Sequence, residues 1–409
     1  MEKYSTAARG YSEIYEQFRT AFDPHKDAVA LPDLETTITM HPFTSDGKSI
    51  LPGLEVYECE HHGTVFNKEE PHHIDDNALP LHAPDWSIEN NIHFSYPIIS
   101  GRDASNGVII MLHGLNEKKW DKYLPWAYKL AELTRKHVIL FPIAFHMNRA
   151  PEEWSDKKLM QMTADMRQHD NVNTSFVNAA ISSRIEQNPQ RFFWSGLQTF
   201  MDIHKLLKNI RSGSIAGIDK DVSIDFFGYS IGAFFSTILF MANPDDLLTE
   251  SRLFAFCGGT TMDRMYPSSR YILDYNASLA LHDFFAKKIN NDFADEERLL
   301  HYLGDQHTGE GYFKTMLLYH HYIDEREARL KEIQNRVKAV SLKKDTVIPP
   351  VEILNALNGR YRDIQIPVEV LDFDYPYSHI APFIAMPKYD KQVTRAFDEV
   401  MGRAAMFLN

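Results

Sequence analysis

The sequence predicts a doubly wound α/β fold with a mostly parallel central sheet. From about residue 91, short runs rich in Val, Ile, Leu and Phe alternate with segments whose pattern is helical. Uninterrupted apolar runs of strand length are typical of strands that helices cover on both faces. The alternation of such strands with helices indicates one open α/β sheet.

Each element of this fold is predicted from its own run of residues. Strands are predicted at 92–99, 107–114, 137–145, 222–228, 252–259, 337–342 and 367–374. Helices are predicted at 8–22, 120–135, 172–187, 191–211, 231–242, 351–359 and 388–407. Parallel strands end at one common edge of a sheet, and open α/β sheets bind their ligands there.

The chain is predicted to divide into an extension, a core and a cap. Residues 1–90 show no strong period and are predicted to form an N-terminal extension packed on the core. The core comprises 91–259 and 336–409, with a helical insertion at 146–221. Residues 260–335 are too many for a plain crossover, so we predict a helical cap over the edge where the strands end.

The overall composition excludes several classes of protein. The 409 residues carry 43 Lys and Arg against 56 Asp and Glu, a net charge of −13, which argues against a nucleic-acid groove. We find no signal peptide and no apolar stretch of membrane-spanning length. Cys59 and Cys257 are too few for a disulfide framework. A cytoplasmic protein that acts on a small molecule, with no nucleic-acid or membrane partner, is therefore expected; the oligomeric state stays open.

The sharpest local motif is Gly-Tyr-Ser-Ile-Gly at residues 228–232, between a predicted buried strand and an apolar helix. An abrupt strand-to-helix turn can hold a serine at the edge of the sheet as a nucleophile. Glycines flank such a serine because the neighbouring strand and helix leave no room for side chains. Ser230 is therefore the predicted nucleophile, and the alternative is a serine in an ordinary turn.

A serine hydroxyl needs a base to take its proton, and that base needs a carboxylate to orient it. His379 lies in the loop after the last predicted strand, and Asp345 follows the strand before it. Both would reach the same edge of the sheet as the predicted nucleophile, so we assign them as base and acid. Asp263, Asp372 and Asp374 are alternative acids.

The third motif is Leu-His-Gly-Leu-Asn at residues 112–116, directly after a predicted strand. Backbone N–H groups placed there can stabilise the negative charge that develops on a carbonyl oxygen during acyl transfer. We assign these donors to Leu115 and Ile231, the second being the residue after the nucleophile. His113 is expected to brace this loop, and Asn116 to shape the same turn.

Taken together, these motifs resemble the α/β-hydrolase superfamily. The His-Gly loop, the G-x-S-x-G turn, the aspartate after a strand and the late loop histidine follow the family's order, and the resemblance covers about residues 91–409. The single His-Gly loop is similar to the branch that lacks the His-Gly-Gly-Gly motif of hormone-sensitive-lipase-like members. The resemblance implies an α/β-hydrolase fold and a catalytic triad of Ser230, Asp345 and His379.

Substrate contacts are predicted near the ends of the same strands. The candidates are His113, Asn116, Asn148, Arg149 and Tyr229, with His146 and Trp154 in the same segment as Asn148. Arg149 could bind a carboxylate or sugar oxygen, or it could pair for structural reasons with Glu152, Glu153 or a helix C-terminus. Aromatic cap residues could form an apolar wall or simply helix core: Tyr266, Tyr271, Tyr275, Phe284 and Phe285.

No metal site or cofactor is predicted. Three histidine pairs were considered as ligands: His61–His62, His72–His73 beside Asp75 and Asp76, and His320–His321. Adjacent side chains point apart on a helix or strand and rarely share one ion. No phosphate-binding or dinucleotide-binding glycine loop occurs.

The sequence therefore predicts a serine hydrolase, with carboxylic esters favoured over amides. A peptidase or carbohydrate esterase is an alternative. A second alternative is a catalytically inactive hydrolase-fold protein used for binding.

Overall fold

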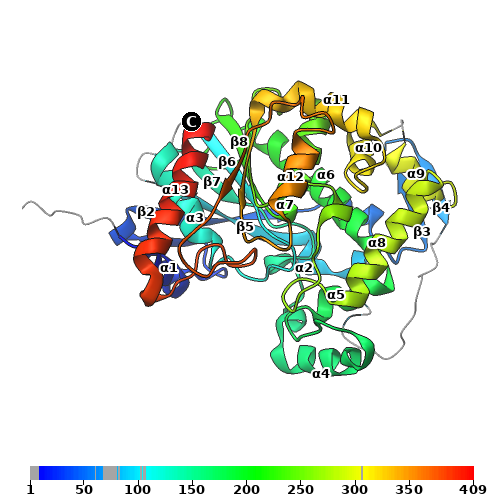
Figure 1. Ribbon diagram of the computed structural model, residues 1–409, viewed down its shortest axis with the longest axis horizontal. Coiled ribbons are helices and arrows are strands. Elements are labelled where there is room, and N and C mark those ends of the chain that lie inside the picture. The colour runs from blue at the N-terminus through cyan, green and yellow to red at the C-terminus, as the bar shows by residue number, and fades with distance from the viewer. Residues whose placement is uncertain are drawn as a thin grey trace, which may run out of the picture.

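The computed structural model describes residues 9–59, 61–67, 81, 83–101, 104, 107–304 and 307–409. Within this part of the chain, nine strands form one sheet in the order β1-β2-β5-β7-β6-β8-β9-β10-β11 (Figure 1). The strands of this sheet are β1 (Ala28–Leu31), β2 (Thr36–Thr44), β5 (His93–Ser100), β6 (Gly107–Leu112), β7 (His137–Leu140), β8 (Ser223–Tyr229), β9 (Leu253–Phe256), β10 (Val337–Leu342) and β11 (Val368–Leu371). The six strands from β7 to β11 in this order are parallel, and β1, β2 and β5 continue the sheet in antiparallel pairing.

Helices cover both faces of this sheet, as the sequence predicts for a doubly wound fold. The helices are α1 (Tyr11–Ala21), α2 (Glu89–Ile92), α3 (Tyr123–Thr134), α4 (Lys157–Arg167), α5 (Ala179–Gln187), α6 (Arg191–Arg211), α7 (Ile231–Ala242), α8 (Tyr275–Asn290), α9 (Glu297–Leu303), α10 (Thr308–Thr315), α11 (Ile323–Ile333), α12 (Pro350–Leu357) and α13 (Asp390–Leu408). Helices α1, α3 and α13 lie together on one face, while α6, α7, α11 and α12 lie on the other (Figure 1).

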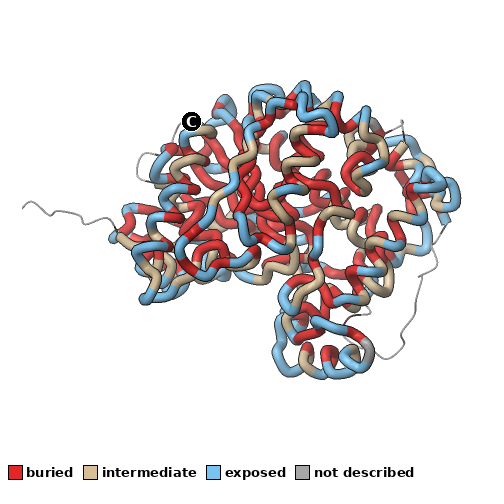
Figure 2. The backbone as a smooth tube through the Cα atoms, viewed as in Figure 1, coloured by how far each residue is buried: buried red, intermediate tan, exposed pale blue. Residues whose placement is uncertain are grey.

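The central strand β6 shows why the apolar runs are uninterrupted. Val108, Ile110 and Leu112 pack into the core beneath α6 and α7. Ile109 and Met111 point to the opposite face and pack with residues of α1, α3 and α13. Successive side chains of a strand alternate between faces, so a strand with helices on both sides must be apolar at every position. Figure 2 shows this buried layer through the middle of the molecule.

All seven predicted strands are present in the sheet, and the helical predictions are confirmed within a few residues except for 172–187, where α5 begins later. The prediction was wrong for residues 28–44, which were placed outside the core but form β1 and β2. The sequence of β2 alternates polar and apolar residues, since part of one face is exposed at this end of the sheet. A search for unbroken apolar runs therefore passes over it.

The two long insertions contain several helices each. The first holds α4, α5 and α6, and the second holds α8 to α11. Helices α5 and α8, one from each insertion, pack against each other on the same side of the molecule as α4 (Figure 1). A separate hairpin, β3 (Val56–Cys59) and β4 (Thr64–Asn67), lies outside the central sheet. No helix in the described part of the chain is long and apolar enough to cross a membrane.

Candidate active site

Ser230 lies on an abrupt turn between β8 and α7. Its φ is 56° and its ψ is −119°, a backbone conformation that L-residues rarely adopt. The flanking glycines are required by close packing: a Cβ at Gly228 would lie 2.6 Å from Cα of Ala233, and one at Gly232 would lie 2.5 Å from the carbonyl oxygen of Leu112. The motif is thus a strained strand-to-helix turn rather than an ordinary one.

A chain of hydrogen bonds connects Ser230 to His379 and Asp345. The Ser230 Oγ lies 2.7 Å from Nε2 of His379, and the His379 Nδ1 lies 2.7 Å from Oδ2 of Asp345. A carboxylate accepts only, so Nδ1 carries the ring proton and Nε2 accepts from the serine hydroxyl. All three residues are buried. The structure therefore brings together the three side chains that the sequence analysis selected.

The orientation of Asp345 is determined by the turn that follows β10. Its second oxygen, Oδ1, accepts hydrogen bonds from the backbone N–H groups of Val347 and Ile348 at 2.9 and 2.8 Å. Only Oδ2 is then directed at the histidine. The carboxylate is held before any substrate arrives, which is the function of the acid in such a chain.

The alternative acids have other partners. The Asp263 carboxylate accepts from the hydroxyl of Thr261 and the backbone N–H of Tyr319. Asp372 accepts from the Tyr377 hydroxyl, and Asp374 is exposed. None of the three contacts His379 in the described part of the chain.

The two backbone N–H groups assigned to the oxyanion border the same pocket as Ser230. Leu115 and Ile231 both line it, and within the described residues neither of their N–H groups donates a hydrogen bond. Ile231 is the first residue of α7, where helical N–H groups lack partners and the helix dipole favours negative charge. This position can therefore stabilise an oxyanion.

His113 braces the Leu115 loop, as predicted. Its Nδ1 donates to the carbonyl oxygen of Gly114 at 2.8 Å, and its Nε2 accepts from the N–H of Ile143 at 2.9 Å. Burial lowers the pKa of His113 well below its usual range, and nearby His146 lowers it further. The ring is therefore a neutral link between the loops after β6 and β7, without a direct contact to the pocket.

A second brace, which sequence analysis missed, connects the Leu115 loop to the His379 loop. The Gly114 N–H donates to the Tyr123 hydroxyl, which in turn donates to Glu117. Lys122 pairs with Glu117 and donates to the carbonyl oxygen of Ile380 at 3.0 Å. These contacts join the stretch 114–123 to the loop that holds His379, and no local sequence signal connects the two.

The pocket at Ser230, here called the Ser230 pocket, encloses about 400 Å³ of space including its opening to solvent. Its lining combines the catalytic edge of the sheet with both insertions: Leu115, Phe192, Ser230, Ile231, Met262, Met265, Pro267, Ile272, Leu281, His282, Val347 and Ile348. Burial lowers the pKa of His282, so this ring is also neutral. Among the described lining residues no side chain is charged, which suits an uncharged apolar group.

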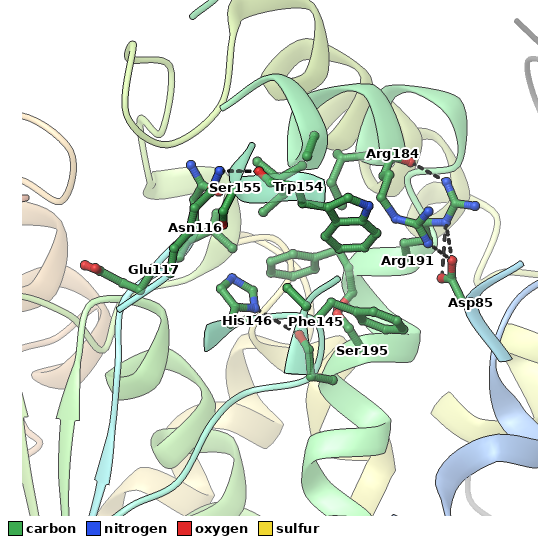
Figure 3. A pocket seen from close by; sticks show the side chains of 18 residues that line it. Asp85, Asn116, Glu117, Phe145, His146, Trp154, Ser155, Arg184, Arg191 and Ser195 are labelled. Atoms are coloured by element: carbon green, nitrogen blue, oxygen red, sulfur yellow. Dashed lines mark hydrogen bonds and ion pairs between the residues drawn. The ribbon is translucent and has the colours of Figure 1, made fainter. Parts of the chain in front are cut away.

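A larger pocket, the Arg184 pocket, encloses about 680 Å³ of space including its opening to solvent, and it shares Leu115 and Phe192 with the Ser230 pocket. Figure 3 shows Arg184 and Arg191 meeting Asp85 at one end of this pocket. His146 lines it; Nδ1 of this ring donates to the Ala144 carbonyl oxygen, and Nε2 has no partner within the described residues. Burial lowers the pKa of His146 to about 4, so the ring is neutral and its Nε2 is a buried acceptor.

Two predicted substrate contacts are corrected by the structure. Arg149 is fully buried and pairs with Asp202 at 2.8 Å, and its other donors bind Asn91 and the Pro142 carbonyl oxygen. The amide of Asn148 donates to the carbonyl oxygen of Ser95. Neither residue lines either pocket. The glutamates considered as partners of Arg149 are close in sequence, whereas Asp202 comes from α6 in the first insertion.

Asn116 and Tyr229 have positioning contacts. Asn116 lines the Arg184 pocket, and its amide donates to the carbonyl oxygens of Val177 and Tyr271, one from each insertion. The Tyr229 hydroxyl donates to the carbonyl oxygen of His379, and the two rings stack 5.6 Å apart. Tyr229 is buried outside both pockets, so the prediction that it contacts substrate was wrong.

The aromatic cap residues do not form the expected wall. Tyr266, Tyr271 and Tyr275 are about half exposed, at 49%, 55% and 49%, whereas Phe284 and Phe285 belong to the core. None is among the described residues that line either pocket. Of the histidine pairs, His72 and His73 with Asp75 and Asp76 lie outside the described residues, and His320 contacts Arg264 instead of a neighbouring histidine.

With a strained serine between β8 and α7, and with helices on both faces of a mostly parallel sheet, the molecule has an α/β-hydrolase fold. The chain belongs to the family described as "Family of unknown function (DUF6051)", whose model matches residues 9–409. A comparison with curated proteins finds no match.

Solved structures similar to this chain include three hydrolases at low identity. Carboxyl esterase 2 from the fungus Tuber melanosporum has a TM-score of 0.42 at 11% identity, covering 77% of this chain and 81% of that one. A thermostable esterase from Pseudomonas putida has a TM-score of 0.42 at 9% identity, and the match covers 98% of this chain and 93% of that one. A peroxisomal α/β-hydrolase of Saccharomyces cerevisiae has a TM-score of 0.41 at 10% identity, and the match covers 91% of this chain and 90% of that one.

Proposed function

We propose that this protein is a serine hydrolase that cleaves carboxylic esters through a covalent acyl-enzyme. One observation carries the proposal: the hydrogen-bond chain from Asp345 through His379 ends at the hydroxyl of Ser230, beside a pocket that Leu115 and Ile231 also line. Nucleophile, base, orienting acid and oxyanion donors are thus within reach of one carbonyl group.

In the first step, Ser230 Oγ attacks the ester carbonyl carbon while its proton passes to Nε2 of His379. The oxygen of the tetrahedral intermediate accepts from the N–H groups of Leu115 and Ile231. Asp345 stabilises the imidazolium, which then gives its proton to the departing alcohol. Water, deprotonated by the same histidine, releases the acyl group as a carboxylic acid and restores the serine.

The two pockets separate the two parts of the ester. The acyl group stays on Ser230 after the first step, so it occupies the apolar, uncharged Ser230 pocket. We infer that the alcohol leaves into the adjoining Arg184 pocket. We therefore propose esters with an uncharged apolar acyl group.

Labelling with a fluorophosphonate tests the nucleophile. Wild type is expected to be labelled and to hydrolyse p-nitrophenyl acyl esters, whereas Ser230→Ala loses labelling and at least about 10⁴-fold in kcat. Ser236→Ala is the matched control, because this buried hydroxyl on α7 bonds only the carbonyl oxygen of Gly232. Well-folded wild type that is neither labelled nor active would instead indicate a binding protein.

A substrate panel tests the ester assignment. Acyl esters of increasing chain length, aminoacyl anilides and acetylated sugars should give their highest kcat/KM with the acyl esters. Higher kcat/KM on the anilides would indicate a peptidase, and on the acetylated sugars a carbohydrate esterase.

A further inference from the structure

We propose a second site in this molecule, a zinc site formed by Cys59, His62, His301 and His307. One ligand atom from each side chain lies within 4.8 Å of those of the other three. Cys59 ends β3 and His62 follows in the turn to β4, whereas His301 lies on α9 and His307 directly precedes α10. The site thus joins the β3–β4 hairpin to the second insertion, at one end of the molecule in Figure 1.

Three of the six separations between the ligand atoms are close to those of a tetrahedral site. The Cys59 Sγ lies 3.6 Å from Nδ1 of His62 and 3.3 Å from Nε2 of His307, which is 3.1 Å from Nε2 of His301. With Zn–S bonds of about 2.3 Å and Zn–N bonds of about 2.0–2.1 Å, neighbouring ligands of a tetrahedral ion lie about 3.3–3.6 Å apart. These three separations fall at or close to these values, and the remaining ones are at most 4.8 Å.

Hydrogen bonding alone satisfies this cluster poorly. Nε2 of His307 faces both the sulfur of Cys59 and a ring nitrogen of His301, yet a ring nitrogen carries at most one proton. A cation at the centre accepts a lone pair from all four atoms at once. Thiolate and imidazole are the ligands that zinc prefers, and four protein ligands leave no open position, which is typical of a structural site.

The surroundings add support from outside the ligand set. Nδ1 of His307 lies 3.6 Å from a carboxylate oxygen of Glu310, and histidine ligands commonly donate their second ring N–H to a carboxylate. This contact turns Nε2 of His307 towards the sulfur. The ligand set is also asymmetric in burial: Cys59 and His307 are buried, while His62 is exposed and leaves an approach for the ion.

The backbone of the hairpin sets the first two ligands. The N–H groups of His62 and Gly63 both donate to the carbonyl oxygen of Cys59, so the chain turns back directly after the cysteine. Gly63 has a φ of 62°, which glycine adopts readily. This turn places the cysteine and the histidine three positions later on the same side. The expectation of no metal site rested on adjacent histidines, and only one member of those pairs belongs to this set.

Metal analysis of the full chain tests the proposal. Wild type, incubated with zinc and dialysed, should retain one zinc per chain, and His62→Asn should bind zinc at least about tenfold more weakly. His61→Asn is the matched control: the neighbouring histidine is equally exposed, receives the same substitution and offers no ligand atom. Equal zinc content in wild type and His62→Asn, or none in either, would overturn the site.

Cobalt provides a second readout that does not depend on the stability of one variant. Cobalt-loaded wild type should show the thiolate-to-metal charge-transfer band, and Cys59→Ser should lack it. A band that persists in Cys59→Ser would overturn the ligand set even if zinc binds. Neither measurement involves Ser230, so both outcomes are independent of the proposed hydrolase activity.

Discussion

Two buried carboxylates near the same edge of the sheet, each paired with a side chain from another element, have different roles. Asp345 and His379 follow β10 and β11 and meet at 2.7 Å; Arg149 follows β7 and meets Asp202 of α6 at 2.8 Å. His379 retains a second ring nitrogen that faces Ser230 and its pocket. Arg149 directs its donors at protein acceptors and lines neither pocket. A polar side chain that follows a strand therefore belongs to a functional site only when one of its polar atoms still faces a cavity.

The largest expected effect is on catalysis by the first pair. Asp345→Asn should lower kcat by about 10⁴-fold, because an amide can hold the histidine in the wrong tautomer. The midpoint of urea unfolding should change little, since the amide oxygen can still accept from Val347 and Ile348. Asp263→Asn is the control, because this carboxylate also follows a strand but should not affect kcat. A larger loss of kcat in Asp263→Asn than in Asp345→Asn would instead make Asp263 the acid that orients His379.

The second pair should affect stability instead of catalysis. Arg149→Met leaves Asp202 buried without its partner and should lower the free energy of unfolding by about 3–5 kcal/mol. Burial already raises the pKa of Asp202, and Arg149 opposes that shift. KM, measured on folded protein, should not change.

The double variant Arg149→Met/Asp202→Leu separates charge from packing. It should recover much of the lost stability in urea, because neither charge is then left buried alone. A rise in KM with unchanged stability in the single variant would instead make Arg149 a substrate contact.

The smallest expected effect is a pH dependence of the free energy of unfolding, which comes from His146 in the same segment as Arg149. Burial lowers the pKa of His146 to about 4 from an ordinary value of 6.5, so the unfolded chain binds its proton first as the pH falls. The contribution of the neutral His146 to the free energy of unfolding is fully present above about pH 6.5 and is lost as the pH falls towards 4. His146→Phe should flatten this part of the unfolding profile measured in urea. An unchanged slope would show that other groups, such as His113, account for it.

Much of the catalytic edge could be predicted because its residues follow patterned segments. Ser230, Asp345 and His379 each come shortly after a strand that the sequence marks by composition. Parallel strands bring their ends together irrespective of the length of chain between them, so the three side chains converge. The pocket walls could not be predicted in this way. Phe192 and Leu281 lie on helices of the insertions, where an apolar residue facing a cavity resembles one facing the core.

The sequence by itself determined the parallel sheet, the strained turn at Ser230 and the order of Ser230, Asp345 and His379 along the sheet edge, because each depends on local periodicity or on a strand's end. Only the tertiary structure decided the partner of Arg149, the two strands added by residues 28–44 and the meeting of Cys59 with His307. These depend on how the hairpin and insertions pack onto the core. Such packing is non-local, and no spacing along the chain encodes it.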